Sequence, residues 1–211
     1  MNKSKSNNIS LTSLRRLPDY LRFLKDEKQK GVSFMSSSVI AEKMQLSPMV
    51  VKKDLAIAKI IEGKPKLGYH LDSLIADIET FLGYNNKKDA VVVGCGKLGK
   101  ALLSYEGFAH YGLNIVVGFD VDQSTEIVAG KKILPMTKFI DLVKRLNIHI
   151  GILTVPKEVA QEIAEMMVAS GIKAIWNWAP IKLDLPASIV IKQEDLSASL
   201  AELSGRLDEI L

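Results

Sequence analysis

Gly94, Gly96 and Gly99 form a Gly-x-Gly-x-x-Gly pattern between an apolar run and a segment of helical periodicity. In a dinucleotide-binding turn the first glycine permits the tight bend, the second lets the backbone approach the pyrophosphate, and the third lets the helix pack closely on the sheet. A helix opening at Lys97 and Leu98 would turn free N–H groups and the positive end of its dipole toward the phosphates. The pattern therefore predicts a cofactor-binding turn.

Two aspartates, Asp120 and Asp122, end the apolar segment that follows the predicted helix. A carboxylate at this place accepts hydrogen bonds from the ribose hydroxyls of a dinucleotide. Two carboxylates would repel a 2′-phosphate, so the sequence favours NADH and NAD⁺ over the phosphorylated cofactors. The alternative is a fold of this kind whose nucleotide site has degenerated.

A third group of candidates follows later strands, where sheets of this kind place their ligands. The backbone expected to line the nicotinamide ribose is that of Thr154, Val155 and Pro156. Asn177 is the candidate for a polar contact with the cofactor. Its neighbours Trp176 and Trp178 are interpreted as core or interface residues rather than as rings that stack on the cofactor.

Charge divides the chain of 211 residues unevenly, although the net charge is only +4. Residues 1–70 carry 14 Lys and Arg against 6 Asp and Glu, whereas residues 71–211 carry 14 against 18. A compact basic third indicates a polyanion partner, and we expect nucleic acid rather than an anionic membrane.

A single cysteine, Cys95, excludes an internal disulfide framework and fits a reducing compartment. Because Cys95 stands beside the predicted helix start, where a thiolate is favoured, it is either a thiol sensor or simply a small turn residue. The chain starts without an apolar signal sequence and has no apolar run of about twenty residues, so a cytoplasmic protein without membrane contact is expected. The histidines lack metal-ligand spacing, and no metal site is predicted.

The N-terminal third has the pattern of a helix-turn-helix unit. Leucines at helical spacing predict a helix over residues 11–29, and a serine run precedes a short helix at 39–44. Ser47 and Pro48 suit the N-cap and first position of a third helix running to about residue 60. In such a unit the second helix of the pair enters the major groove of DNA.

Candidate DNA-binding residues lie at the start of the third helix and in the segment after it. Those placed to reach bases and phosphates are Ser47, Met49, Lys52 and Lys53. The glycine- and proline-rich segment 62–69 predicts a tight hairpin, or wing, with Lys64 and Lys66 at its tip. The alternative is a small helical domain on which the lysines form a solvated face.

Strands and helices alternate after a connecting helix at 71–82 and a polar linker. The expected strands are 90–93, 115–120, one near 132–134, 148–155, 174–176 and 189–191, and the expected helices are 98–109, 137–146 and 158–169. Alternation at these lengths is typical of an α/β fold with a doubly wound parallel sheet of the Rossmann type. We therefore expect a winged helix-turn-helix domain at 1–83 and a nucleotide-binding domain at 84–192.

The last segment, 193–211, has the pattern of an amphipathic helix, with a stripe formed by Leu196, Leu200, Leu203, Leu207 and Ile210. Such a stripe must be covered. Because the sheet has ended, a second subunit is the expected partner, and the chain's own N-terminal domain is the alternative.

These features together resemble the Rex redox-sensing transcriptional repressors over nearly the whole chain. The segments that carry the resemblance are 14–22, 51–55, 63–69, 93–101, 104–108, 118–122, 152–156 and 171–180. The resemblance implies a homodimer with swapped terminal helices, palindromic operator DNA as the partner, and release of that DNA by NADH but not by NAD⁺. It also places Tyr105 near the nicotinamide and the dimer contact, and pairs Arg22 with Asp195 across the domains.

The chain departs from the family pattern at three places. The segment Asp54–Lys59 replaces the usual Asp-Leu-Ser-Tyr-Phe-Gly, Trp178 stands where the family has Phe in Asn-Phe-Ala-Pro, and Leu196 replaces an aromatic residue. Two functions remain open from the residues themselves. One is a regulator without chemistry of its own, and the other is a small NAD-dependent dehydrogenase with a basic N-terminal appendage, for which the domain leaves little room.

Overall fold

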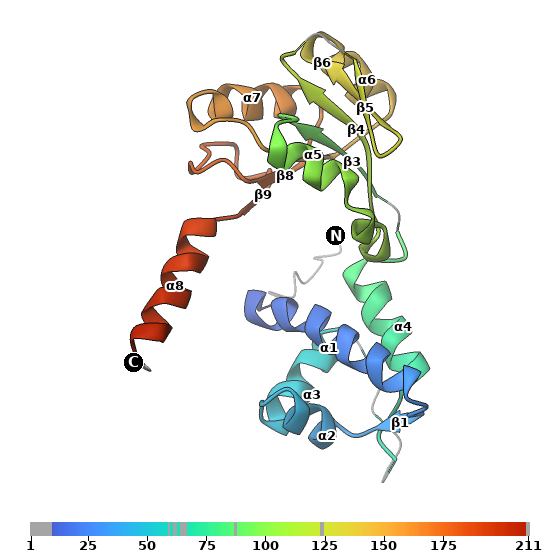
Figure 1. Ribbon diagram of the computed structural model, residues 1–211. Helices are drawn as coiled ribbons and strands as arrows, with labels where there is room; N and C mark the ends of the chain where they lie inside the picture. The colour runs from blue at the N-terminus through green and yellow to red at the C-terminus, as the bar shows by residue number, and fades with distance from the viewer. Residues whose placement is uncertain are drawn as a thin grey trace, which may run out of the picture. The chain divides into compact units, whose positions relative to one another are not determined.

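The computed structural model describes residues 10–58, 60, 63, 67–86, 88–122 and 125–209, with only the backbone of Asp208 described. The chain divides into two compact units, Met1–Asn86 and Lys87–Leu211 (Figure 1). The second unit includes the C-terminal helix.

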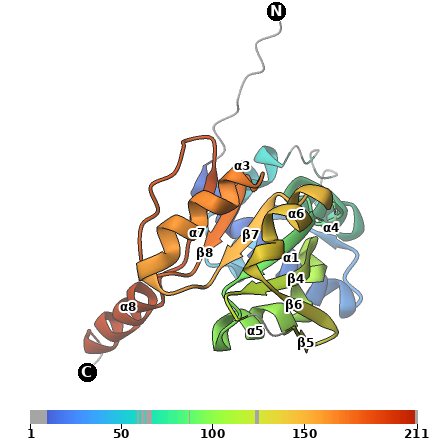
Figure 2. The same ribbon diagram turned by 90° about the horizontal axis from the view of Figure 1, so that it is seen from above.

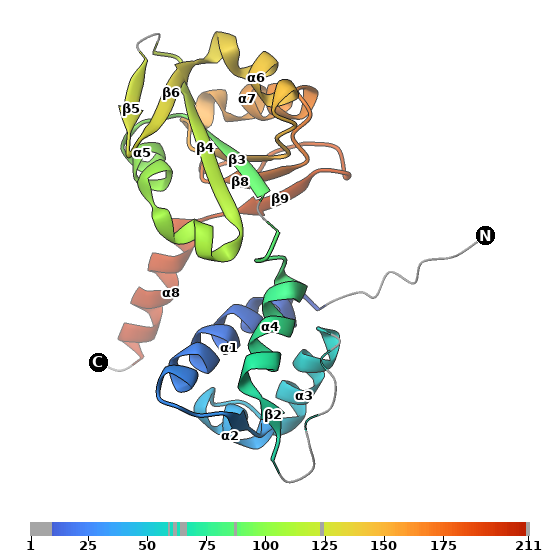
Figure 3. The ribbon, with the colours of Figure 1, turned by 90° about the vertical axis from the view of Figure 1, so that its right-hand side faces the viewer.

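The first unit is helical, as Figure 3 shows. Its helices are α1 (Leu11–Gln29), α2 (Ser37–Lys43), α3 (Pro48–Ile57) and α4 (Leu71–Leu82). Two short antiparallel strands, β1 (Phe34–Met35) and β2 (Tyr69–His70), join the segment after α1 to the start of α4. The predicted helices at 11–29 and 71–82 are confirmed.

Capping residues set the ends of the helix-turn-helix pair. The hydroxyl of Ser36 accepts the Val39 N–H, so α2 begins two residues before the expected position. The hydroxyl of Ser47 accepts the Val50 N–H, which confirms the predicted cap of α3. The predicted extension of α3 to about residue 60 is wrong, since the helix ends at Ile57.

The core of the first unit joins all four helices. Leu17, Leu24 and Tyr20 of α1 are fully buried, and α2, α3 and α4 contribute their own buried apolar side chains. Leu14, expected on the same stripe of α1, is more than one-third exposed. Burial of this core orders α3 and leaves its other face open to solvent.

The second unit contains a seven-stranded sheet in the order β5-β6-β4-β3-β7-β8-β9. Its strands are β3 (Lys88–Val93), β4 (Leu113–Asp120), β5 (Glu126–Val128), β6 (Lys131–Pro135), β7 (Ile150–Leu153), β8 (Ala174–Asn177) and β9 (Val190–Gln193). All pairs are parallel except β5 with β6. Because β3 lies centrally and the chain leaves it in both directions, the sheet is doubly wound, as predicted.

Helices cover both faces of this sheet (Figure 2). They are α5 (Lys97–Ser104), α6 (Phe139–Arg145) and α7 (Lys157–Ala169). A 3₁₀ helix, η1 (Glu106–Tyr111), follows α5, and another, η2 (Met136–Lys138), precedes α6. Val91 and Val93 pack in one cluster with α6 and α7. Ala90 and Val92 pack in the opposite cluster with α5. This alternation is what a strand buried on both faces requires.

Other differences from the predicted elements occur in the second unit. The predicted helix at 98–109 stops at Ser104, because Tyr105 has an extended backbone and a 3₁₀ turn follows. The strand β5 was not predicted. Gln193 belongs to β9, so the last helix, α8, covers Leu196–Asp208 rather than beginning at 193.

Candidate functional site

The glycine turn connects β3 to α5 and has no room for side chains at two of its glycines. Gly94 has a φ of +91°, and a Cβ there would lie 2.7 Å from the Thr154 carbonyl oxygen. A Cβ at Gly99 would run into the Gly94 carbonyl oxygen. At Gly96 a Cβ would meet no atom within 4 Å, so this backbone faces open space. The turn therefore has the tight bend at Gly94 and the close packing at Gly99 that the sequence predicts, and its backbone at Gly96 is open to a ligand.

Asp120 is fixed at the end of β4 by the backbone around it. Its Oδ2 accepts the Cys95 N–H at 2.5 Å, and its Oδ1 accepts the Asp122 N–H at 3.3 Å. The carboxylate thus ties the glycine turn to the second strand. Each carboxylate oxygen can accept more than one hydrogen bond, so Asp120 can also accept a ribose hydroxyl.

The side chain of Cys95 turns into the sheet, away from the ligand side. It is buried and lies 3.5 Å from the Phe119 carbonyl oxygen. Burial and the neighbouring charge of Asp120 raise the pKa of this thiol to about 12, which keeps it protonated at neutral pH. The buried, protonated thiol does not support the thiolate-sensor interpretation and fits the alternative of a small turn residue.

One cavity of about 880 Å³ brings most of the predicted cofactor residues together. The predicted residues that line it are Gly94, Gly96, Lys97, Leu98, Asp120, Thr154, Val155 and Pro156. Thr154 is further anchored because its hydroxyl donates to the carbonyl oxygens of Val93, at 3.1 Å, and Gly94, at 2.6 Å. The cavity thus runs across the carboxyl ends of the central strands, where sheets of this topology hold ligands.

The remaining cofactor candidates do not line this cavity. Asn177 is fully buried, and its amide bonds the Ile181 carbonyl oxygen, the Gln193 side chain and the Ala179 N–H. These three bonds shape the loop after β8, so the expected polar contact between Asn177 and the cofactor is not supported.

Three further candidates have other surroundings. Gly99 packs beneath the turn, and Asp122 is exposed beside Asp120. Tyr105 is exposed and packs edge-on against Phe108, with ring centroids 4.8 Å apart.

Trp178 is one of several cavity residues that were not predicted as cofactor contacts. It was assigned to the core or an interface, yet it lines the cavity together with Val155, Val159 and Ile163. Its Nε1 is buried without a hydrogen-bond partner in the described part of the chain. The sequence did place Trp178 at the end of a strand, where ligands bind, but the same is true of its neighbour Asn177.

These features fit a dinucleotide. Open space above Gly96 leaves backbone N–H groups at the start of α5 accessible to a pyrophosphate. Asp120 lies at one end of the cavity for a ribose, and a mostly apolar wall that also includes Glu162 stands at the other end for an aromatic ring.

The candidate DNA-binding face lies on α3 in the first unit. Met49 is 79% exposed, and Lys52, Lys53 and Ala56 are exposed on the same helix. These residues recur at helical spacing and form one stripe, while Val51 and Leu55 point into the core. The structure thus places Met49, Lys52 and Lys53 together, beside the capping residue Ser47.

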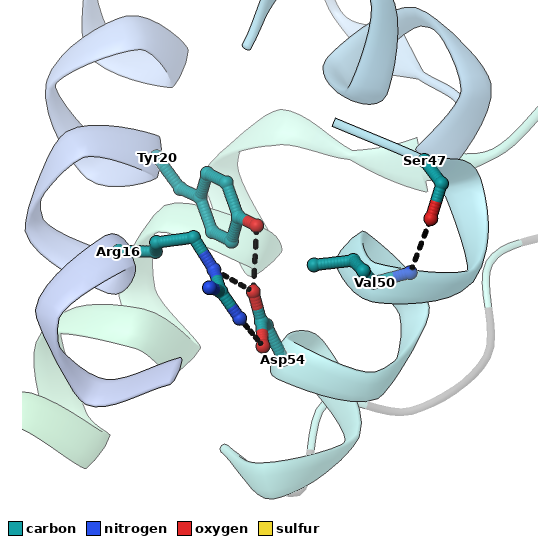
Figure 4. Close-up of polar contacts among 5 residues, drawn as sticks. All are labelled: Arg16, Tyr20, Ser47, Val50 and Asp54. Carbon is teal, nitrogen blue, oxygen red and sulfur yellow. Dashed lines mark hydrogen bonds and ion pairs between the residues drawn. The ribbon is translucent and has the colours of Figure 1, made fainter. Parts of the chain in front are cut away.

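A buried polar cluster holds this helix against α1 (Figure 4). Arg16 donates twice to the Asp54 carboxylate, at 2.6 and 2.7 Å, and the Tyr20 hydroxyl donates to Asp54 at 2.7 Å. Burial of Asp54 alone would raise its pKa, but hydrogen bonds from Arg16, Ser13 and Tyr20 outweigh burial and lower the pKa. Asp54 therefore stays ionised between the two helices.

The predicted wing is described only at its base. The backbones of Gly63 and Gly68 approach so closely that a Cβ on Gly63 would lie 2.7 Å from the Gly68 carbonyl carbon. Lys64 and Lys66, predicted at the tip, lie outside the described residues.

Arg22 and Asp195 each have a partner on their own helix. Arg22 bonds Asp19 at 2.7 Å, and Asp195 caps α8 by accepting the N–H groups of Ser197 and Ala198. The apolar stripe of α8 is exposed, with side chains 53–67% accessible at Leu196, Leu200, Leu203 and Leu207. Ile210, expected on the same stripe, lies outside the described residues.

Among the described residues no helix is long and apolar enough to cross a membrane. No group of three or more His, Cys, Asp or Glu side chains suited to a metal ion occurs in the same part of the chain.

Known proteins resemble both units. A family profile described as a CoA binding domain matches residues 85–181, and one described as a putative DNA-binding protein N-terminus matches residues 8–56. The redox-sensing transcriptional repressor Rex of Treponema denticola is 45% identical over 90% of this chain and 91% of its own length. The Rex protein of Bacteroides fragilis is 40% identical over 96% of this chain and 93% of its own length.

Solved structures agree over the same extent. RSP, a Rex-family repressor crystallised with NAD⁺ and operator DNA, is 32% identical with a TM-score of 0.90, covering 95% of this chain and 93% of that one. RSP crystallised with NADH is 31% identical with a TM-score of 0.85, covering 96% and 95%. On these identities and coverages, the chain belongs to the Rex family of redox-sensing transcriptional repressors.

Proposed function

We propose that this protein is a repressor that senses the NADH/NAD⁺ ratio, binds palindromic operator DNA as a homodimer, and is released from it by NADH. The observation that supports this proposal most directly is that one chain combines a cavity suited to a dinucleotide with an exposed, partly basic helix, α3. The relatives are named repressors, so we do not retain the alternative of a small dehydrogenase.

NADH and NAD⁺ are the proposed ligands, and each part of the cavity has a part of the ligand to hold. Backbone N–H groups at Gly96 and Lys97 bind the pyrophosphate, and Asp120 binds the adenosine ribose. Thr154, Val155 and Pro156 line the nicotinamide half. The nicotinamide ring distinguishes the two ligands, because it is cationic when oxidised and neutral when reduced.

The DNA contacts divide by chemistry. Met49 and the capped start of α3, with Ser47, face the bases, and Lys52 and Lys53 contact phosphates. Lys64 and Lys66, which belong to the predicted wing, are proposed as further phosphate contacts. A protein with this partner and one cysteine is proposed to work in the cytoplasm.

Dimerisation is proposed to cover the exposed leucines of α8. Four leucines on this one helix are more than half exposed. A contiguous exposed apolar patch of this kind marks an interaction surface. Tyr105 is proposed to lie near the nicotinamide and the dimer contact. In the DNA-bound dimer, Arg22 and Asp195 are proposed to leave their present partners and pair across the domains.

Release requires that NADH bind the DNA-incompetent form of the dimer more tightly than the competent form, because a ligand with equal affinity for both shifts nothing. The test is a gel-shift titration with a palindromic AT-rich duplex, adding NADH and NAD⁺ separately. NADH should lower the operator affinity and NAD⁺ should not. Equal effects of both nucleotides would contradict the proposed sensing.

A further inference from the structure

Trp178 stands at one end of the nucleotide cavity and forms part of its wall. It follows the carboxyl end of β8 and lines the cavity with Val155, Val159 and Ile163. Its Nε1–H is buried and finds no acceptor among the described residues. Because Nε1 is enclosed, the part of Trp178 that the cavity reaches is its ring.

The cavity has two chemically different ends. Asp120, Val121 and Met136 follow β4 and β6 on one side of the glycine turn. Trp178 and Val155 follow β8 and β7 on the other side. Because the carboxylate takes the adenosine ribose and the turn takes the pyrophosphate, the nicotinamide must extend toward Trp178.

A second tryptophan, Trp176, packs against the ring of Trp178. The ring centroids of Trp176 and Trp178 lie 5.2 Å apart. Trp176 is itself held, since its Nε1 donates to Glu194 Oε1 at 2.8 Å and its ring meets Phe108 edge-on at 5.6 Å. Trp178 thus packs beside an aromatic ring that is itself held in place.

We infer that Trp178 forms the wall against which the nicotinamide ring lies, and that its aromatic face sets how strongly the chain prefers NADH over NAD⁺. This inference rests on the proposed binding of these two nucleotides. The aliphatic neighbours Val155, Val159 and Ile163 favour the neutral reduced ring, because a cation loses hydration beside them. The carboxylate of Glu162, which lines the same cavity, acts in the opposite direction. The indole face attracts a cation, so Trp178 keeps the oxidised ring bindable.

An aliphatic replacement should therefore change the preference. A cation–π contact contributes about 0.5–2 kcal/mol, which corresponds to a factor of about 2–30 in affinity. In Trp178→Leu the NAD⁺ affinity should fall by a factor in this range, and the NADH affinity should fall less. In Trp178→Phe, which keeps an aromatic face, the ratio of the two affinities should stay within about twofold of the starting protein.

Indole emission provides a readout of contact that does not depend on repression. The chain has two tryptophans, so Trp176→Phe leaves Trp178 as the only indole, and Trp178→Phe leaves Trp176. NAD⁺ quenches an indole when its electron-poor ring touches it. We expect saturating NAD⁺ to quench most of the emission of Trp176→Phe and little of that of Trp178→Phe.

The experiment uses the full-length protein, with calorimetric titration of NADH and NAD⁺ into each variant. Equal NAD⁺ quenching in the two single-tryptophan variants, or an unchanged affinity ratio in Trp178→Leu, would overturn the inference. If Trp178→Leu fails to fold, the quenching comparison of the two phenylalanine variants still decides. Failure of the starting protein to bind either nucleotide would instead refute the proposed function itself.

Discussion

Replacing Asp54 by Asn tests whether the buried cluster holds the recognition helix in place. Asn keeps the volume of Asp but has one acceptor oxygen, and its amide group would face the donors of Arg16. Arg16 is 26% exposed and can regain water, whereas the Tyr20 hydroxyl is fully buried and cannot. The variant therefore loses charge-assisted bonds and leaves a buried donor poorly satisfied.

The magnitude follows from the bonds that Asp54 makes. Hydrogen bonds to a charged group contribute about 1.5–3 kcal/mol each, and removing one partner of a buried ion pair costs about 3–5 kcal/mol. Because Arg16 is partly solvated, we expect a loss near the lower limit, about 3 kcal/mol. Tyr20→Phe removes a single bond and should cost about 1.5 kcal/mol.

Hydrogen exchange on the full-length protein measures this loss locally. A loss of about 3 kcal/mol should speed amide exchange in α1 and α3 by about a hundredfold, while the strands β3 and β7 of the second unit remain unchanged. Operator affinity should fall more than affinity for random DNA, because the stripe around Met49 loses its fixed orientation. Unchanged exchange in α3, or equal acceleration in both units, would refute the reasoning.

The same cluster predicts a dependence on pH. Because the folded state lowers the pKa of Asp54, its contribution to stability is present above the unfolded pKa and disappears as the pH falls through the folded pKa. The folded state raises the pKa of Tyr20, mainly by burial and by its bond to Asp54. That contribution is present below the unfolded pKa of about 10 and is lost as the pH rises above it. Asp54→Asn should remove the acid-side dependence in α3.

The other predictions concern the cofactor, the dimer and the DNA. Asp120→Asn keeps an acceptor for the Cys95 N–H but removes the charge, so calorimetry should show the preference for NADH over NADPH falling by about tenfold; an unchanged preference would mean that the carboxylate does not face the ribose. Leu200→Glu with Leu203→Glu should yield monomers in light scattering, and a stable dimer would contradict the role of α8. Lys52→Ala and Lys53→Ala should each weaken binding to operator and random DNA alike and lower the salt slope by about 0.9; a loss confined to the operator would indicate base contacts instead.

Elements whose signals lie in a few neighbouring residues were predictable. Ser47 and Pro48 identified the start of α3, and the glycine spacing identified the turn after β3. These signals are local because a cap or a tight turn is satisfied by atoms within a few positions. Asp120 lies farther along the chain and was predictable for another reason, since the strand that it ends and its spacing from the turn are both visible in the sequence.

Elements that depend on an unusual residue in a turn were not predictable. The hairpin between β5 and β6 turns at Ala129 and Gly130, whose φ angles are +49° and +76°. Two positive angles define the turn that joins such strands, and Asn or Asp is the expected first residue. Alanine at this position gives no such signal, so β5 remained hidden. The end of α5 was missed for a similar reason. The Tyr105 ring occupies the space where a side chain at position 107 would lie, and only the glycine there leaves room for it.

The site itself shows where residue type misleads. Asn177 and Trp178 are neighbours at a strand end, and polarity alone favoured Asn177 as the ligand contact. Successive side chains of a strand point to opposite sides, so only one of the two can face the cavity. Asn177 is the inward one, because the loop after β8 needs its three hydrogen bonds. The direction of the strand therefore gives the cavity wall to Trp178.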